Sequence, residues 1–177
     1  LINDILDLSS LEAGYMMLER SEFKVQSMMQ GVHDLMAEWA RKEQVQMILK
    51  ITKNIGTFTG DESRLKQAAV NLVRNALSFT PAGGTITLGA ARLPDGLEIT
   101  VSDTGIGIAE EDRSRIFEPF ERARGGDLGT RGNRGGAGLG LSLVKNIIAL
   151  HGGNVDLQST PGVGTSVTLF LPSSSIK

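Results

Sequence analysis

Apolar side chains recur every three or four residues along several stretches of the chain, and this period predicts helices. The stretches are 1–20, 27–43, 62–79, a short one at 109–117, and 139–151. Asp61 is suited to cap the third helix, which should end before Thr80-Pro81 and Gly83-Gly84. The second helix should carry Met28, Val32, Leu35, Met36 and Trp39 on one side.

The first stretch carries two short apolar stripes, Leu1, Ile5 and Leu8 on one and Ile2 and Leu6 on the other. A stripe this short packs either on a partner helix or on its own domain, and the pattern leaves both open. The chain begins without Met and inside the helical pattern, with no start signal for the helix. We therefore expect it to be a piece of a longer protein.

Apolar runs bounded by turn residues predict strands. A short strand is expected at 23–25, and longer ones at 45–51, 85–92, 97–103, 153–158 and 164–171. Leu93-Pro94-Asp95-Gly96 has strong turn chemistry and should join two of them into a hairpin. Helices interspersed with hairpins predict an α+β fold: a two-layer α/β sandwich with a mixed sheet covered on one face by helices, preceded by helix 1–20.

Residues 118–138 have no sustained period, and a loop of this length inside a domain is usually functional or disordered. The segment contains seven glycines and four arginines, Arg122, Arg124, Arg131 and Arg134. It could be a lid in which an arginine approaches phosphate, or a solvated surface. Ordering so many glycines without a ligand would cost conformational entropy.

Composition narrows the class of protein. The chain has 177 residues, 40% hydrophobic and 21% charged, which fits one soluble globular domain. A net charge of −2 does not favour nucleic acid as a partner. The absence of cysteine excludes disulfides, cysteine metal sites and a thiol nucleophile. No apolar run reaches the roughly 20 residues of a membrane span.

Three stretches could carry chemistry. Asn71 and Asn75 are four residues apart on one helix face, where they could face Mg²⁺ and phosphate or simply be exposed amides. Segment 135–142 places glycines before a helix, as phosphate sites do, but it has neither the P-loop spacing nor a preceding Rossmann strand. Asp103, at a strand end before Gly105 and Gly107, could accept a hydrogen bond from an exocyclic amine or only cap a turn.

Four segments in sequence order strongly resemble the N, G1, F and G2 boxes of sensor histidine kinases. They are NLVRNA, DTGIGI, IFEPFERA and GAGLGLSLVKNIIALHGG, and GVGTSVTLFLP resembles the closing strand of the same domain. The resemblance implies the Bergerat ATP-binding fold shared with gyrase-type and mismatch-repair ATPases. It divides the chain into 1–20, the end of a dimerisation and phosphoacceptor helix; 21–173, the ATP-binding catalytic domain with a lid at 118–138; and 174–177, a tail.

The resemblance implies ATP and Mg²⁺ as cofactors and gives roles to individual residues. Asn75 matches the Mg²⁺ ligand and Asn71 the position one turn before it, both as catalytic residues. Asp103 matches the acid that reads adenine. The other ATP-binding positions are Gly105, Gly107 and Ile108 beside the base, Phe117 and Phe120 at the lid, Gly136, Gly138, Leu139 and Gly140 on the phosphate side, and Thr165 near Asp103.

Two positions depart from the family pattern. Ser78 replaces a frequent Lys that could reach phosphate, and Ala137 replaces a usual Thr, so both changes remove groups that could favour nucleotide binding or turnover. His33 and His151 lie outside the sequence context of a phosphoacceptor, so both are interpreted as structural. The acceptor is expected upstream of Leu1.

The implied reaction transfers the γ-phosphoryl group of ATP to a residue on an upstream dimerisation helix. One alternative is a degenerate kinase-like module that acts by docking. Another is an ATP hydrolase, which Asn71 disfavours because gyrase-like relatives have Glu there and an amide cannot act as a base. Expected partners are a second copy through upstream helices and a response regulator or phosphotransfer protein, with no nucleic acid and no membrane contact. We expect a cytoplasmic location, free or as the cytoplasmic part of a membrane-anchored sensor.

Overall fold

The computed structural model describes residues 2–118 and 140–173. Its helices are α1 (Ile2–Glu12), α2 (Val25–Lys42), α3 (Glu62–Phe79), α4 (Glu110–Arg113) and α5 (Gly140–Leu150). Its strands are β1 (Ser21–Lys24), β2 (Gln46–Ile51), β3 (Thr57–Gly60), β4 (Thr85–Leu93), β5 (Gly96–Asp103), β6 (Asn154–Thr160) and β7 (Gly164–Pro172).

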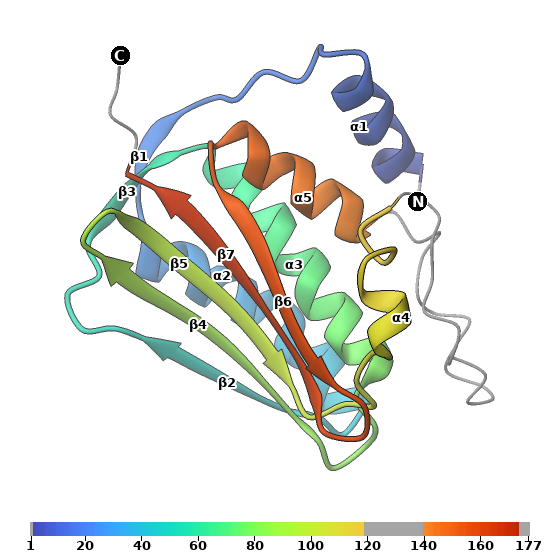
Figure 1. Ribbon diagram of the computed structural model, residues 1–177. Coiled ribbons are helices and arrows are strands. Elements are labelled where there is room, and N and C mark those ends of the chain that lie inside the picture. Colours follow the sequence, from blue (N-terminus) through green and yellow to red (C-terminus); the bar gives the residue numbers. More distant parts are fainter. Residues whose placement is uncertain (1, 119–139, 174–177) are drawn as a thin grey trace.

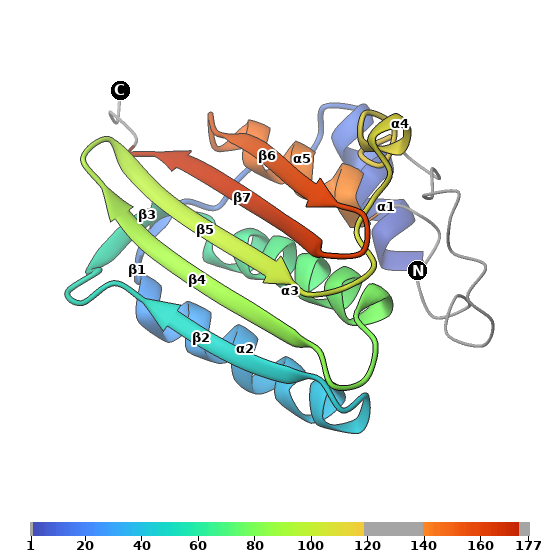
Figure 2. The same ribbon diagram turned by 60° about the horizontal axis from the view of Figure 1, so that its bottom comes forward.

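The main sheet has five strands in the order β2-β4-β5-β7-β6. β2 runs parallel to β4, and the remaining pairs are antiparallel. Helices α2, α3 and α5 cover one face of this sheet, as the two views in Figures 1 and 2 show. The expected two-layer sandwich with a mixed sheet is therefore confirmed.

The core lies between this sheet and the helices. Every second residue of the central strands is buried, which is the pattern of a sheet with one covered face. The buried residues are Leu97, Ile99 and Val101 on β5 and Val167, Leu169 and Leu171 on β7. α3 contributes a wide buried face from Leu65 to Leu77 to this core.

The prediction of one helix over 1–20 is wrong in its extent, because α1 ends at Glu12. Gly14 follows in the left-handed conformation, with φ of +71°, which commonly ends a helix. Leu8 is buried, and Asp7 pairs with Arg64 of α3 at 3.2 Å. One side of α1 thus packs on its own domain, whereas Ile5 and Leu6 remain exposed.

Other elements also differ from what the sequence pattern predicts. β3 was not expected; it pairs antiparallel with β1, and the interacting residues are far apart in the chain. α2 begins at Val25, so the preceding strand ends at Lys24, and the regular helix near 109–117 covers only α4. Leu35 is 61% exposed, because the buried face of α2 is centred on Val25, Met28, Met29, Val32, Met36 and Ala40.

The N-cap assigned to Asp61 is confirmed. Its Oδ1 accepts the backbone N–H of Arg64 at 3.1 Å, and its Oδ2 accepts that of Glu19 at 2.9 Å. The backbone N–H of Asp61 donates to Nε2 of His151 at 3.0 Å. Nδ1 of His151 lies 2.8 Å from the Ile147 carbonyl oxygen and so must carry the proton. His151 is a buried structural histidine that joins α5 to the start of α3.

This arrangement predicts that His151 makes the fold sensitive to acid. Burial lowers the pKa of His151, opposed by the Ile147 hydrogen bond. The unfolded state then binds a proton more readily than the folded state. The stability from neutral His151 is fully present above about pH 6.5, the ordinary histidine pKa, and is lost as pH falls below it.

Urea denaturation at about pH 7.5 and about pH 5.5 measures this effect. The loss of free energy of unfolding between the two should be smaller in His151→Gln than in the unaltered chain. His33→Gln is the control, because His33 is only partly buried and lies beside Asp34. Equal pH dependence in His151→Gln and the unaltered chain would contradict the assignment.

Candidate functional site

Three strands bring polar residues together at one end of the main sheet. β5 ends at Asp103, β7 begins at Gly164, and β6 ends at Thr160. The register pairs Asp103 with Thr165, and Thr165 with Ser159. Three polar side chains therefore form one row across β5, β7 and β6.

The loop after β5, residues 104–109, is held between α3 and the β6–β7 turn. Its Ile106 N–H donates to the carbonyl of Phe79, the last residue of α3, at 3.2 Å. The Ile106 carbonyl accepts the N–H of Gly162 at 2.7 Å. A Cβ at Gly105 would lie 2.5 Å from the Phe79 carbonyl oxygen, so no other residue fits there without a backbone shift. The glycines of this loop permit close approach of backbone to backbone.

Asp103 is the charged group of the site. Its Oδ1 accepts the backbone N–H groups of Gly105 at 2.8 Å and Thr165 at 3.3 Å. None of the residues that the structure describes hydrogen-bonds its Oδ2. Burial raises the pKa of Asp103, and the two amides partly oppose that rise. The carboxylate is thus fixed through one oxygen while the other can accept a hydrogen bond from a ligand.

The two amides expected to act together lie on α3. Asn71 is 8% exposed, and its Nδ2 has no hydrogen-bond partner among residues 2–118 and 140–173. An unpaired buried donor costs about 1–3 kcal/mol, so it calls for a ligand. A Cβ at Gly140, the first residue of α5, would lie 3.9 Å from Cβ of Asn71. Asn71 therefore faces the start of α5, and half-buried Asn75 follows one turn later.

Other expected site residues fall into two groups. Ile108 lies in the loop beside Asp103, and Phe117 follows the buried Ile116 after α4. Ser78 cannot replace a phosphate-binding Lys in the position described, because its Oγ donates to the Arg74 carbonyl at 3.1 Å. Outside the described residues lie Phe120, Gly136, Ala137, Gly138, Leu139, the four arginines and the expected lid from residue 119 onward.

Sequence reasoning missed Ser159 and Arg113. Ser159 is buried, and its Oγ accepts the N–H of Ile108 at 2.7 Å. The guanidinium of Arg113, in α4, donates to the carbonyl of Ser159. Ser159 lies among polar residues at the end of β6, so the nearby sequence gives no signal of this role. Only the strand register, which places Ser159 opposite Thr165, could have indicated it.

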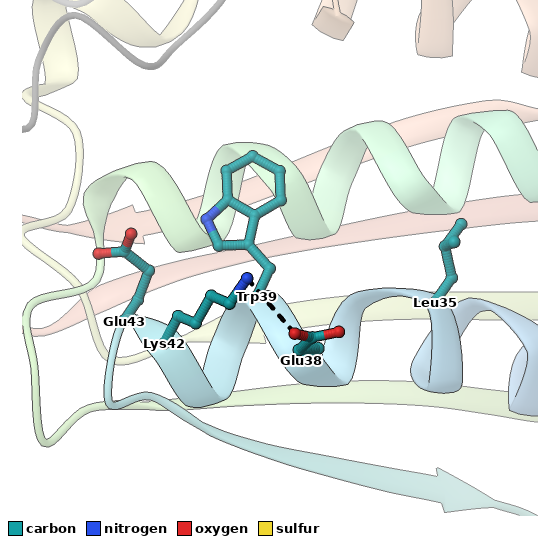
Figure 3. Close-up of a pocket in the computed structure, with 5 residues that line it drawn as sticks. All are labelled: Leu35, Glu38, Trp39, Lys42 and Glu43. Atoms are coloured by element: carbon teal, nitrogen blue, oxygen red, sulfur yellow. Dashed lines mark ion pairs between the residues drawn. The ribbon is translucent and has the colours of Figure 1, made fainter.

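A hollow lies on α2, away from the row that contains Asp103. It is lined by Leu35, Glu38, Trp39, Lys42 and Glu43 (Figure 3). Glu38 and Lys42 form an ion pair at 3.3 Å one helical turn apart. The hollow shares no residue with the row that contains Asp103, and its three charged side chains are two carboxylates and one ammonium group.

The described residues lack a membrane span and a metal-binding cluster of acidic, histidine or cysteine side chains. In that part of the chain no helix is both long and apolar enough to cross a bilayer. It also holds no group of three or more His, Cys, Asp or Glu side chains placed to bind a metal ion.

Comparison with known proteins agrees with this geometry. Residues 60–175 match the family described as histidine kinase-, DNA gyrase B-, and HSP90-like ATPase. The chain is 38% identical to the circadian input-output histidine kinase CikA of Synechococcus elongatus, over 99% of this chain and 23% of that protein. It is 40% identical to the histidine protein kinase DivJ of Caulobacter vibrioides, over 97% of this chain and 28% of that protein.

A solved structure gives the same result. Full-length ShkA in complex with AMPPNP superposes with a TM-score of 0.83 at 29% identity, over 98% of this chain and 36% of that one. The chain spans only about a quarter of the two curated relatives described. Since the family profile covers well over half of the chain, this protein belongs to the family of histidine kinase-, DNA gyrase B-, and HSP90-like ATPases.

Proposed function

We propose that this chain is the ATP-binding catalytic domain of a sensor histidine kinase, and that it transfers the γ-phosphoryl group of ATP to a histidine on an upstream dimerisation helix. The observation that carries the proposal is the half-buried Asp103 carboxylate, held on Oδ1 and open on Oδ2, beside a glycine loop. An acceptor fixed at a sheet end fits the exocyclic amine of adenine. The histidine kinase relatives and the AMPPNP-bound neighbour support the same ligand class.

The residues present fit ATP with Mg²⁺. The unpaired Nδ2 of Asn71 is a donor suited to phosphate oxygen, and the side-chain oxygen of Asn75 is the kind of hard ligand that Mg²⁺ takes. Mg²⁺, when bound, would neutralise charge on the transferring phosphoryl group. Asp103 would orient the base, while Gly105 and Gly107 would let the loop backbone lie close to it. The chain's contribution is thus positioning and charge compensation.

Two other functions are disfavoured. A hydrolase of this family would need a base for water, and Asn71 supplies only an amide at the corresponding position. A docking module without nucleotide would leave the buried Asn71 donor unexplained. We propose a response regulator or phosphotransfer protein as the downstream partner, and a second copy, joined through upstream helices, as the dimer partner.

Calorimetric titration of the chain with ATP, with and without Mg²⁺, tests the binding step. Acid-labile phosphate on a longer protein that includes the upstream helices tests transfer. If the chain bound ATP neither with nor without Mg²⁺, the proposal would be refuted. Release of inorganic phosphate by this chain alone, at a rate matching transfer, would favour the hydrolase instead.

Asn75→Ala should remove most of the increase in ATP affinity that Mg²⁺ produces, because the variant loses a ligand oxygen. Titrations of both proteins with and without Mg²⁺ measure that ratio. Asn154→Ala is a matched control, since Asn154 is an exposed amide at the far end of β6. An equal Mg²⁺ effect in Asn75→Ala and the original chain would exclude Asn75 as the ligand.

A further inference from the structure

Ser159, Thr165 and Asp103 share the helix-facing side of the sheet. The register makes Thr165 the direct neighbour of both others. Val101 lies two residues before Asp103 on β5, and Val167 lies two residues after Thr165 on β7. Both valines are buried in the core. Because side chains two apart on a strand point to the same face, the row points toward the helix layer, where the candidate site lies.

One placement of the hydrogens satisfies all three contacts of the Ser159 hydroxyl. Its Oγ lies 2.7 Å from the Ile108 N–H, which can only donate, and 3.1 Å from the Gly164 carbonyl, which can only accept. A hydroxyl has one hydrogen, and in this placement the Gly164 carbonyl accepts it. The 2.7 Å contact with Oγ1 of Thr165 then uses the hydrogen of Thr165.

Oγ1 of Thr165 is therefore left with lone pairs only. Asp103, when ionised, also presents only acceptors. The backbone N–H of Thr165 is already directed at Oδ1 of Asp103. The two neighbouring side chains thus offer acceptors and no donor to a ligand that reaches them.

We propose that Ser159 is a positioning residue that holds the Thr165 hydroxyl as an acceptor beside Asp103, so that the site selects a 6-amino purine over a 6-oxo purine. The inference rests on the proposed nucleotide-binding function. An amine donates to two acceptors, whereas a 6-oxo group is itself an acceptor and is repelled by them. Without Ser159, the Thr165 hydroxyl can rotate and donate to the oxo group.

Affinities for ATP and inosine triphosphate, measured by calorimetry with Mg²⁺ on the whole chain, test the proposal. Inosine triphosphate carries an oxo group at position 6 and a hydrogen on N1 but otherwise matches ATP. Ser159→Ala should reduce the preference for ATP by about fivefold or more, the scale of one hydrogen bond. If Ser159 had a purely structural role, the variant would bind both nucleotides more weakly by the same factor, and the ratio of the two affinities would stay unchanged.

Ser166→Ala is the matched control. Its hydroxyl is also part-buried and bonded to another hydroxyl, that of Ser102 at 2.8 Å, one position along β7 from Thr165 and on the opposite face. This variant should keep the original ratio. A loss of preference in Ser166→Ala equal to that in Ser159→Ala would overturn the proposal.

Variants of Thr165 keep the test decisive even where Ser159→Ala does not fold. Thr165→Val should reduce the preference, leaving the part that Asp103 supplies, and Thr165→Ser should keep it in full. Ser159→Ala should add nothing in the Thr165→Val background. A Thr165→Val protein that retains the full preference would overturn the inference while leaving the proposed function intact. An original chain that binds neither nucleotide would instead refute the proposed function.

Discussion

Asp103→Asn should weaken ATP binding about 10- to 150-fold, the effect of losing a hydrogen bond of about 1.5–3 kcal/mol to a charged acceptor. The side-chain oxygen of Asn can still accept the N–H groups of Gly105 and Thr165, which now bind Oδ1. The amide nitrogen would then replace Oδ2 and direct hydrogens at the exocyclic amine. Two donors would face each other where a donor and an acceptor met before.

The same substitution should leave the fold as stable or make it more stable. Burial raises the pKa of Asp103 above its ordinary value of 3.8. With a raised pKa the folded state binds the proton more tightly, so stability falls as pH rises through the window between 3.8 and the folded-state pKa. Above that window the whole cost of the buried charge is present, and Asn removes it.

Calorimetry for ATP affinity and thermal denaturation for stability give the two readings on one protein. Asp156→Asn is the control, because Asp156 is an exposed carboxylate on β6 opposite Thr168. It should change neither reading. If a folded Asp103→Asn protein bound ATP as well as the original chain, Asp103 would not be the group that reads the base.

Particular elements show how much of the fold short-range sequence signals can predict. α3 was predicted from end to end, since its cap at Asp61 and its stop before Pro81 are both short-range signals. β3 was missed because its partner β1 lies more than thirty residues upstream, and Phe58 is its only large apolar side chain. The apolar period extends past the end of α1, because the period does not register that Gly14 turns the chain out of the helix.

In the candidate site, too, some residues could be predicted from the nearby sequence and others depend on strand pairing. Asp103 and its glycine loop were visible as a carboxylate at a strand end followed by residues that permit close backbone approach. Ser159 was not, because its contacts depend on how β6 aligns with β7. Leu35 had the right helical spacing for the core, yet it borders an open hollow, because spacing gives a face of a helix and only packing decides its centre.

Gly107→Ala should lower the free energy of unfolding by about 2–5 kcal/mol and raise the dissociation constant for ATP about tenfold or more. Gly107 has φ of +73°, where a side chain costs about 1–2 kcal/mol. Its Cβ would also lie 2.3 Å from the carbonyl oxygen of Thr160, which is backbone and cannot rotate away. The loop must move off the β6–β7 turn, and Ile108 then loses its contact with Ser159.

Gly162→Ala separates these two costs. Gly162 lies in the β6–β7 turn with nearly the same φ, +77°, but among the described residues no heavy atom lies within 4 Å of its would-be Cβ. Its N–H, 2.7 Å from the Ile106 carbonyl, is retained in alanine. Gly162→Ala should therefore lose only about 1–2 kcal/mol of stability and bind ATP within about twofold of the original. Equal losses of stability and affinity in the two variants, measured by urea denaturation and calorimetry, would show that backbone conformation alone, and not contact between the loop and the turn, requires glycine at 107.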